Sequence, residues 1–296
     1  MKRILVTGAK GRVGRCVARR LCAESVELRV LRRAPPAPDE VHVGEVVIGD
    51  FSNETQMALA FGSMDAVFMY APDASASDAV FRAARQAGVR QVVLLSSAAV
   101  TRVPPGVNPI AERHRIAENA AQAAGMNWTF IRPDSMASNC LQWTRSIREE
   151  RRVYVPYPGS MRCAVHEDDI ALLAVQCLLS ERYSARTVEV TGGEVLRIHE
   201  QVQCIASHLG TRIECVTVSE QDALHRMQAA NQALSLPAAR RLLDYLKKSV
   251  TVAPRISDEF SQFTGRASRS FGDWVRDNID HFLPCPGAGT NDKVSG

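Results

Sequence analysis

A glycine-rich turn near the N-terminus constrains the fold of this chain more than any other feature. An apolar run of strand length ends at Thr7, and Thr7-Gly8-Ala9-Lys10-Gly11-Arg12-Val13-Gly14 leads directly into a helical pattern. In such a strand–turn–helix unit, the three glycines permit the tight turn, the approach of a pyrophosphate and close helix–strand packing. The N–H groups that open the helix then face the anion. The spacing therefore predicts a dinucleotide-binding turn whose contacts are Thr7, Gly8, Lys10, Gly11, Arg12, Val13 and Gly14.

The first half of the chain alternates apolar runs of strand length with helical patterns. This alternation is typical of βαβ units that form a parallel sheet. The predicted strands are Arg3–Thr7, Leu28–Leu31, Glu45–Ile48, Ala66–Tyr70, Gln91–Leu95 and Trp128–Arg132. The predicted helices are Gly11–Cys22, Glu54–Phe61, Ser77–Ala87 and Glu112–Ala124. The fold class is therefore expected to be α/β, a doubly wound parallel Rossmann sheet with a smaller, mainly helical C-terminal substrate region.

The pattern loosens after Asp134. A helix over 139–150 leads to the Pro- and Tyr-rich segment 153–159, which is typical of a surface loop. His166 precedes three acidic residues and an apolar helix, and acids in a first helical turn favour a helix start over a metal cluster. Later residues predict one more strand and four helices: Thr187–Thr191, Ile198–Leu209, Glu220–Ala230, Pro237–Lys248 and Phe271–Phe282.

These patterns predict three consecutive regions. Residues 1–150 are expected to form the cofactor-binding Rossmann domain. Residues 151–283 are expected to form a substrate-binding and lid region, with one strand near 187–191 that returns to the sheet. The segment 284–296, rich in Gly, Thr, Asn and Ser, is expected to be disordered.

Composition narrows the class of protein. The formal net charge is +4, and the Arg residues are spread along the chain, which favours a solvated surface over a nucleic-acid interface. No apolar run approaches the roughly 20 residues that a membrane span needs. The eight cysteines contain no C-x-x-C pair, which favours the cytoplasm and argues against a disulfide framework and a zinc site. No metal is expected.

The end of the second predicted strand bears on the choice of cofactor. Leu31-Arg32-Arg33 stands where an NAD site would carry an acidic residue for the ribose hydroxyls. Two guanidinium groups suit a 2′-phosphate through bidentate contacts, and Lys10 and Arg12 add positive charge nearby. The sequence therefore favours NADP(H), with NAD(H) as the alternative if these arginines are merely solvated.

Several segments together resemble the NmrA-like branch of atypical short-chain dehydrogenases/reductases, which includes type 2 quinone oxidoreductases and triphenylmethane reductase. The matching segments are Thr7–Gly14, Asp65–Phe68 with Ala71-Pro72, Val92–Ser97, His114–Glu118, Gly125–Pro133, Asp168–Ala171 and Gly265–Trp274. The resemblance implies further cofactor contacts. Asp50 would bind the adenine amino group, Phe51 would contact the adenine ring, and Ala71-Pro72 would pass beside the cofactor ribose. Pro133 is a further implied contact.

The catalytic residues of typical short-chain reductases are missing. Those enzymes use Ser with Tyr-x-x-x-Lys, but this chain has no Tyr between Tyr70 and Tyr154 and no Lys between Lys10 and Lys247. The candidate catalytic residues are instead Ser96, Ser97 and His114. Glu118 lies four residues after His114 on one helical face and could orient the imidazole. His114 could position cofactor or substrate, donate a proton, or have a surface role only. The serines are expected to be nicotinamide-side hydrogen-bond donors.

The preferred interpretation is an NADPH-dependent reductase of an aromatic, quinone-like or polycyclic polyketide carbonyl that lacks the Ser-Tyr-Lys triad. Frequent Arg and Ala with few Lys are typical of a high-GC bacterium, and the chain is similar in type to angucyclinone ketoreductases of antibiotic biosynthesis. The expected substrate contacts are Met136, Trp143 and Tyr157. A monomer or homodimer is expected, without nucleic acid or membrane partners. The alternative is a non-catalytic NADP(H)-sensing regulator of the NmrA type that binds a protein partner.

Overall fold

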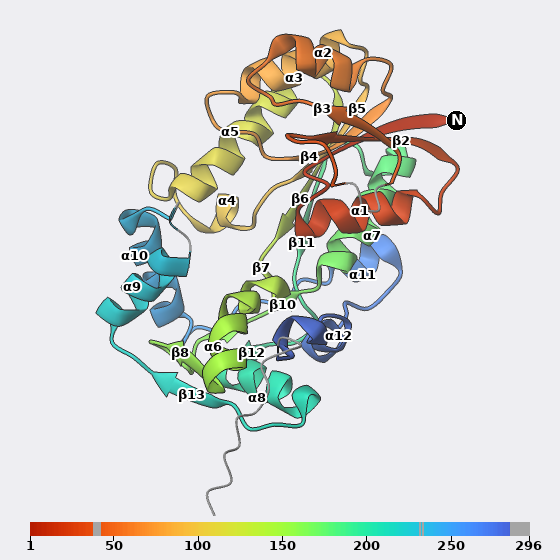
Figure 1. Ribbon diagram of the computed structural model, residues 1–296. Helices are drawn as coiled ribbons and strands as arrows, with labels where there is room; N and C mark the ends of the chain where they lie inside the picture. The colour runs from red at the N-terminus through yellow and green to blue at the C-terminus, as the bar shows by residue number, and fades with distance from the viewer. Residues whose placement is uncertain (38–42, 231, 233, 285–296) are drawn as a thin grey trace, which may run out of the picture. The chain divides into compact units, whose positions relative to one another are not determined.

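The computed structural model describes residues 1–37, 43–230, 232 and 234–284 of the chain (Figure 1). Its centre is a seven-stranded parallel sheet in the order β11-β6-β5-β4-β1-β2-β3. The strands are β1 (Lys2–Thr7), β2 (Val26–Arg32), β3 (Glu45–Ile48), β4 (Ala66–Tyr70), β5 (Gln91–Leu95), β6 (Asn127–Pro133) and β11 (Arg186–Val190). This sheet confirms the predicted doubly wound α/β fold. The order reverses between β1 and β4, and ligands of such folds bind at the carboxyl ends of the strands beside this point.

Helices cover both faces of the sheet, because buried side chains of the strands point alternately to either face. Val93 and Leu95 share one apolar cluster with α1 (Arg12–Leu21) and α7 (Glu167–Leu179). Val92 and Leu94 share the other with the helices α2 (Glu54–Phe61), α3 (Ser77–Gln86) and α5 (Pro109–Ala123). Each predicted helix of the first half is present, with ends that shift by up to three residues.

The chain divides into two compact units that interleave along the sequence. Unit 1 contains Met1–Met136, Ala164–Gly193 and Ile256–Arg269, and unit 2 contains the segments between and after them. The predicted division at residue 150 differs from this one, because α7 packs on the sheet face and β11 pairs with β6 at the sheet edge. The strand predicted near 187–191 is this edge strand. Unit 1 also holds α4 (Ala99–Arg102), η2 (Glu181–Tyr183), α11 (Glu259–Thr264), and the pair β7 (Ser135–Met136) and β10 (Ala164–Val165).

Unit 2 is mainly helical with two short strand pairs. Its helical elements are η1 (Ala137–Trp143), α6 (Thr144–Glu150), α8 (Ile198–Leu209), α9 (Glu220–Ala230), α10 (Leu236–Lys248), α12 (Phe271–Asp277) and η3 (Ile279–Phe282). Its strands pair as β8 (Arg152–Val155) with β13 (Glu214–Thr217), and β9 (Met161–Arg162) with β12 (Leu196–Arg197). The prediction of a surface loop from residue 153 is therefore wrong at its start, because Val153 and Val155 are buried in a parallel strand pair. The predicted disordered tail lies outside the described residues.

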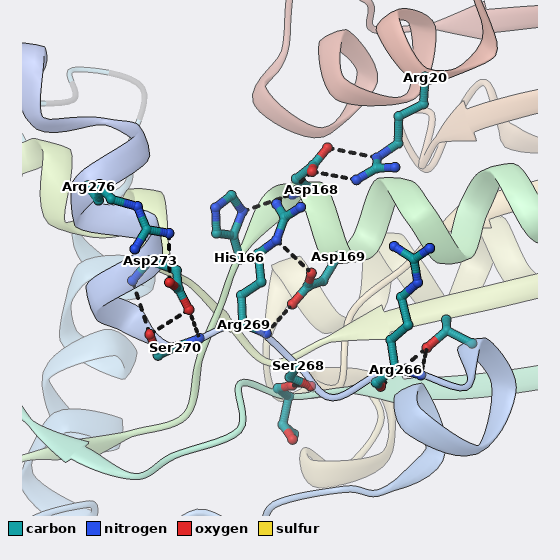
Figure 2. A network of polar contacts seen from close by, with 12 residues as sticks. Arg20, His166, Asp168, Asp169, Arg266, Ser268, Arg269, Ser270, Asp273 and Arg276 are labelled. Carbon is teal, nitrogen blue, oxygen red and sulfur yellow. Dashed lines mark hydrogen bonds and ion pairs between the residues drawn. The ribbon is translucent and has the colours of Figure 1, made fainter. Parts of the chain in front are cut away.

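A carboxylate at the start of α7 ties three segments of unit 1 together (Figure 2). Asp168 accepts hydrogen bonds from Arg20 Nε at 2.8 Å and Nη2 at 2.5 Å, and from Arg269 Nη1 at 2.6 Å. The Arg269 main-chain N–H also donates to Asp169 Oδ2 at 2.8 Å. His166 caps the helix, since its Nδ1 accepts from the Asp168 N–H at 3.1 Å. The cap confirms the predicted helix start at His166. The bonds from Arg20 to Asp168 fix α1, the helix that follows the glycine turn, against α7.

Asp168 should make stability depend on acid pH. Burial alone would raise the pKa of Asp168, but the hydrogen bonds from Arg20 and Arg269 outweigh it and lower the pKa to about 2 from 3.8. The folded state therefore binds the proton less readily than the unfolded state. The resulting stabilisation, about 2 kcal/mol, is present above pH 4 and is lost as pH falls toward 2. We expect Asp168→Asn to lower the free energy of unfolding at pH 7 by at least that amount.

Denaturant unfolding as a function of pH measures this dependence. The difference between Asp168→Asn and the unchanged protein should shrink between pH 4 and pH 2. Asp244→Asn, which alters an exposed carboxylate of α10, is the matched control and should not change stability at either pH. A pH-independent deficit in Asp168→Asn would contradict the assignment.

Candidate active site

The glycine turn has the geometry of an anion cradle. Gly8 has a φ of +67°, which a side chain would strain, and a Cβ at Gly14 would lie only 2.3 Å from the Gly8 carbonyl oxygen. The Gly11 N–H donates to that same oxygen at 2.8 Å. Gly11 is the N-cap of α1 and makes no side-chain hydrogen bond to the helix start, where the N–H groups of a helix stabilise an anion. The residues present therefore fit the pyrophosphate of a dinucleotide.

The two arginines that close β2 occupy different environments. Arg32 is buried, whereas the Arg33 side chain is 86% exposed and its Nε lies 3.1 Å from Asp50 Oδ2. The Ser52 main-chain N–H and Arg33 lower the pKa of Asp50. An exposed ion pair contributes little free energy, so Arg33 can turn toward an incoming phosphate at small cost. Phe51 stacks on Phe61, with ring centroids 6.4 Å apart, beside the same edge.

Arg113 of α5 holds the main chain that follows β4. Its Nε donates to the carbonyl oxygens of Ala71 at 3.1 Å and Pro72 at 3.0 Å. Its guanidinium carbon lies 5.2 Å from the centroid of the Tyr70 ring. The Tyr70 Cβ is also 3.9 Å from the position of a Cβ built on Gly8. The segment predicted to pass beside the ribose is therefore fixed next to the glycine turn.

Tyr70 lies beside the candidate site, although the sequence did not single it out. It ends β4 and is 44% exposed, and its ring meets His114 edge to face with centroids 5.9 Å apart. As the last residue of an apolar strand, it looks like part of the core. The only sequence signal was its place at the carboxyl end of a parallel strand, where ligands bind.

Ser96 follows β5 and is almost fully buried. Its hydroxyl donates to Glu118 Oε1 at 2.5 Å, and Arg132 of β6 donates to both carboxylate oxygens of Glu118. The expectation that Glu118 orients His114 is therefore wrong. The two residues share a helical face, but the guanidinium and the serine hydroxyl take the carboxylate.

His114 is a buried imidazole whose Nδ1 has no hydrogen-bond partner among the described residues. Burial, with a smaller contribution from the charge of Arg113, lowers the pKa of His114 to about 4. The ring is therefore neutral at pH 7. A neutral imidazole is a far weaker acid than an imidazolium, which disfavours proton donation by His114.

Ser97 and Pro133 meet at the same edge of unit 1. Ser97 Oγ accepts from the Ala99 N–H at 3.2 Å, which starts α4, and the Ala98 N–H donates to the Pro133 carbonyl oxygen at 3.0 Å. Ser97 and Pro133 thus lie near Ser96 at the carboxyl ends of β5 and β6, and their roles at the site stay predictions.

The three predicted substrate contacts do not belong to one unit. Met136 of unit 1 packs on the core of the sheet, whereas Trp143 and Tyr157 belong to unit 2. Trp143 is buried, and the Tyr157 hydroxyl donates to Glu220. A joint role of the three in binding a substrate stays a prediction.

The described residues contain neither a candidate metal cluster nor a candidate membrane span. No group of three or more His, Cys, Asp or Glu side chains among them could hold a metal ion. No helix in this part of the chain has both the length and the apolar character that a membrane crossing requires.

Comparison with known proteins decides the family. The model of a family described as NAD(P)H-binding matches residues 8–181, which include the glycine turn, Ser96 and His114. The chain belongs to this NAD(P)H-binding family.

Two reductases align along most of the chain. A (4-alkanoyl-5-oxo-2,5-dihydrofuran-3-yl)methyl phosphate reductase of Streptomyces griseus is 33% identical over 285 residues, which cover 95% of this chain and 99% of the relative. An NAD(P)H azoreductase of Xenophilus azovorans is 26% identical and covers 92% of this chain and 96% of that protein. These relatives place the chain among NAD(P)H-dependent oxidoreductases.

Solved structures support the same fold. Citrobacter sp. triphenylmethane reductase complexed with NADP(H) has a TM-score of 0.74 at 20% identity and covers 94% of this chain and 99% of that one. The Escherichia coli quinone oxidoreductase QOR2 complexed with NADPH has a TM-score of 0.76 at 16% identity, covering 93% and 99%. The NmrA-like resemblance expected from the sequence is confirmed at the level of the family.

Arg33 should determine the preference of this family member for NADPH. Loss of a charged hydrogen bond corresponds to a roughly 10- to 100-fold change in affinity. We expect Arg33→Ala to weaken binding of NADPH by that factor and binding of NADH by less than threefold, as measured by fluorescence titration. Arg85→Ala, which alters an exposed arginine of α3, is the matched control. Equal binding of both cofactors by the unchanged protein would refute the role assigned to Arg33.

Proposed function

We propose that this chain is an NADPH-dependent reductase that transfers hydride to a conjugated small molecule without a dedicated side-chain acid. The acceptor class is an aromatic, quinone-like or polycyclic carbonyl compound, including polyketide ketones of antibiotic biosynthesis. The protein would act in the cytoplasm as a monomer or homodimer. NADPH, when bound at the glycine turn, supplies the hydride.

One observation supports this function more than any other: Ser96 and His114, the polar candidates at the carboxyl end of β5 and on α5, are both poorly suited to protonate an alkoxide, and the Tyr-x-x-x-Lys pair of typical short-chain reductases is missing. The segment between Tyr70 and Tyr154 contains no tyrosine, and no lysine lies between Lys10 and Lys247. The Ser96 hydroxyl donates its hydrogen bond to Glu118, and a pKa of about 4 keeps His114 neutral at pH 7.

A conjugated acceptor reduces the need for such an acid. Hydride addition to it forms an anion whose charge spreads to a distant oxygen, and water can then protonate that oxygen. An isolated ketone instead concentrates the charge on one oxygen, where a positioned acid typically contributes 10²–10⁴-fold. Proximity and orientation, worth about 7–11 kcal/mol, can carry the rest of the catalysis.

The names of the related reductases support a conjugated acceptor. They describe reductases of a 5-oxo-2,5-dihydrofuran, of azo compounds, of triphenylmethane dyes and of quinones. Each of these acceptors has an electron-poor double bond within a conjugated system. Transfer of this property to the present chain is part of the proposal.

A screen of NADPH oxidation tests the function. Quinones, polycyclic aromatic ketones and acyl dihydrofuranones should be reduced, whereas a saturated ketone such as cyclohexanone should not be. Equal rates with cyclohexanone would contradict the absence of an acid. Tight binding of NADP(H) with no turnover of any acceptor would instead support the non-catalytic NADP(H)-sensing regulator.

No single substitution at the candidate catalytic residues should abolish turnover. We expect Ser96→Ala, Ser97→Ala and His114→Ala each to retain kcat within about tenfold, because a supporting hydrogen bond is worth about 1 kcal/mol. His114→Ala should mainly raise KM for the cofactor. A thousandfold loss of kcat in His114→Ala with cofactor affinity intact would make His114 the acid.

The pH profile should lack a histidine step. With a pKa of about 4, His114 stays neutral from pH 5 to pH 9, so kcat/KM should not inflect near 6.5 because of this group. Comparison of the profiles of the unchanged enzyme and His114→Gln measures this. An inflection near 6.5 that disappears in His114→Gln would show that His114 titrates during turnover.

A further inference from the structure

The proposed function assigns one buried polar network of unit 1 no part in binding the cofactor. Ser96 of the β5 edge, Glu118 of α5 and Arg132 of β6 meet in it, and Ser96 and Glu118 are 3% and 4% exposed. The Ser96 hydroxyl donates to Glu118 Oε1 at 2.5 Å. Arg132 Nε donates to the same oxygen at 2.8 Å, and Arg132 Nη2 donates to Oε2 at 2.5 Å. Three donors therefore converge on one carboxylate.

The network fixes the direction in which the Ser96 hydroxyl donates its hydrogen bond. A serine hydroxyl has one proton and two lone pairs, and a carboxylate paired with a guanidinium can only accept. The single proton of Ser96 is therefore directed at Glu118, away from any ligand. Toward any other partner, Ser96 Oγ can act only as an acceptor, through its lone pairs.

Ser96 stands where the main chain fixes it firmly. Its N–H donates to the Ile131 carbonyl oxygen at 2.8 Å, which extends the β5–β6 ladder by one residue. Ser96 lies at the carboxyl edge of the sheet, one strand beyond β4, and this is the edge at which doubly wound folds bind their ligands. An acceptor held at this position matches a ligand that offers an N–H or O–H group.

We infer that Ser96 accepts a hydrogen bond from bound NADPH, and that Glu118 and Arg132 are positioning residues that impose this direction of hydrogen bonding. NADPH offers two groups of the required kind, its ribose hydroxyls and the N–H₂ of its carboxamide. The inference rests on the proposed function, and it reverses the expected role of Ser96 as a donor. It also explains why Ser96 cannot protonate or stabilise an oxyanion on the acceptor molecule.

Cofactor titrations test the inference without any substrate. Ser96→Ala should raise Kd for NADPH roughly fivefold, the usual effect of one lost neutral hydrogen bond. Glu118→Gln should also raise Kd, because the amide can donate to Ser96 and turn its proton toward the cofactor. The double variant should bind NADPH no more weakly than Ser96→Ala, since Glu118 acts through Ser96.

Stability measurements separate positioning from a merely structural role. Ser160→Ala removes a hydroxyl of unit 2 that is equally buried and hydrogen-bonded to Ser249, so it is the matched control for the loss of a serine. It should lower Tm but leave Kd for NADPH unchanged. If Glu118→Gln does not fold, Arg132→Lys replaces it, because lysine keeps the charge and loses the two-point geometry.

Three outcomes would overturn the inference. Unchanged Kd in Ser96→Ala, in a protein that binds NADPH, would show that Ser96 does not contact the cofactor. Unchanged Kd with a raised KM for the acceptor alone would assign the hydrogen bond to the substrate. Additive losses in the double variant would show that Glu118 acts independently of Ser96. Failure of the unchanged protein to bind NADPH would instead refute the proposed function.

Discussion

The close approach of Gly14 to the Gly8 carbonyl is the contact on which the site depends. A side chain at Gly14 would begin 2.3 Å from that oxygen, so only glycine lets α1 start directly above the end of β1. This placement aims the helix N-terminus at the carboxyl edge of the sheet, where anions are stabilised. The bonds from Arg20 to Asp168 then hold the other end of α1 against α7. The cofactor turn is thus supported at both ends of one short helix.

The same edge combines features that suit a dinucleotide with a serine and a histidine that are poor proton donors. Arg33, Tyr70 and the start of α1, where no side chain caps the helix, lie at the carboxyl ends of β2, β4 and β1. The Ser96 hydroxyl donates a hydrogen bond to Glu118, and burial keeps His114 neutral. These features together favour an enzyme that orients a hydride donor and leaves protonation to water. The proposed conjugated acceptor is a substrate class that can be reduced without a dedicated side-chain acid.

Local sequence signals predicted most of unit 1, because its strands and glycine turn depend on neighbouring residues. The strand pair β8–β13 was missed because Val153 and Cys215, which lie opposite each other, are far apart in the sequence. The interleaving of the two units was missed for the same reason. α7 and the segment 256–269 belong to unit 1, although segments of unit 2 separate them from the rest of unit 1 in the sequence. Within the site, the prediction that Glu118 orients His114 rested on their helical spacing alone. Arg132, brought alongside by β6, forms a two-point ion pair with Glu118 that no helical spacing reveals.

The central claim is that hydride transfer precedes protonation by water, and combined isotope effects test it most directly. The rate would be measured with a quinone and NADPH deuterated at the transferred position, in H₂O and in D₂O. We predict a primary isotope effect on kcat/KM and a solvent isotope effect close to one. A large solvent effect, with the primary effect undiminished in D₂O, would mean that hydride and proton move in one step. That result would require an acid in the site and would contradict the account.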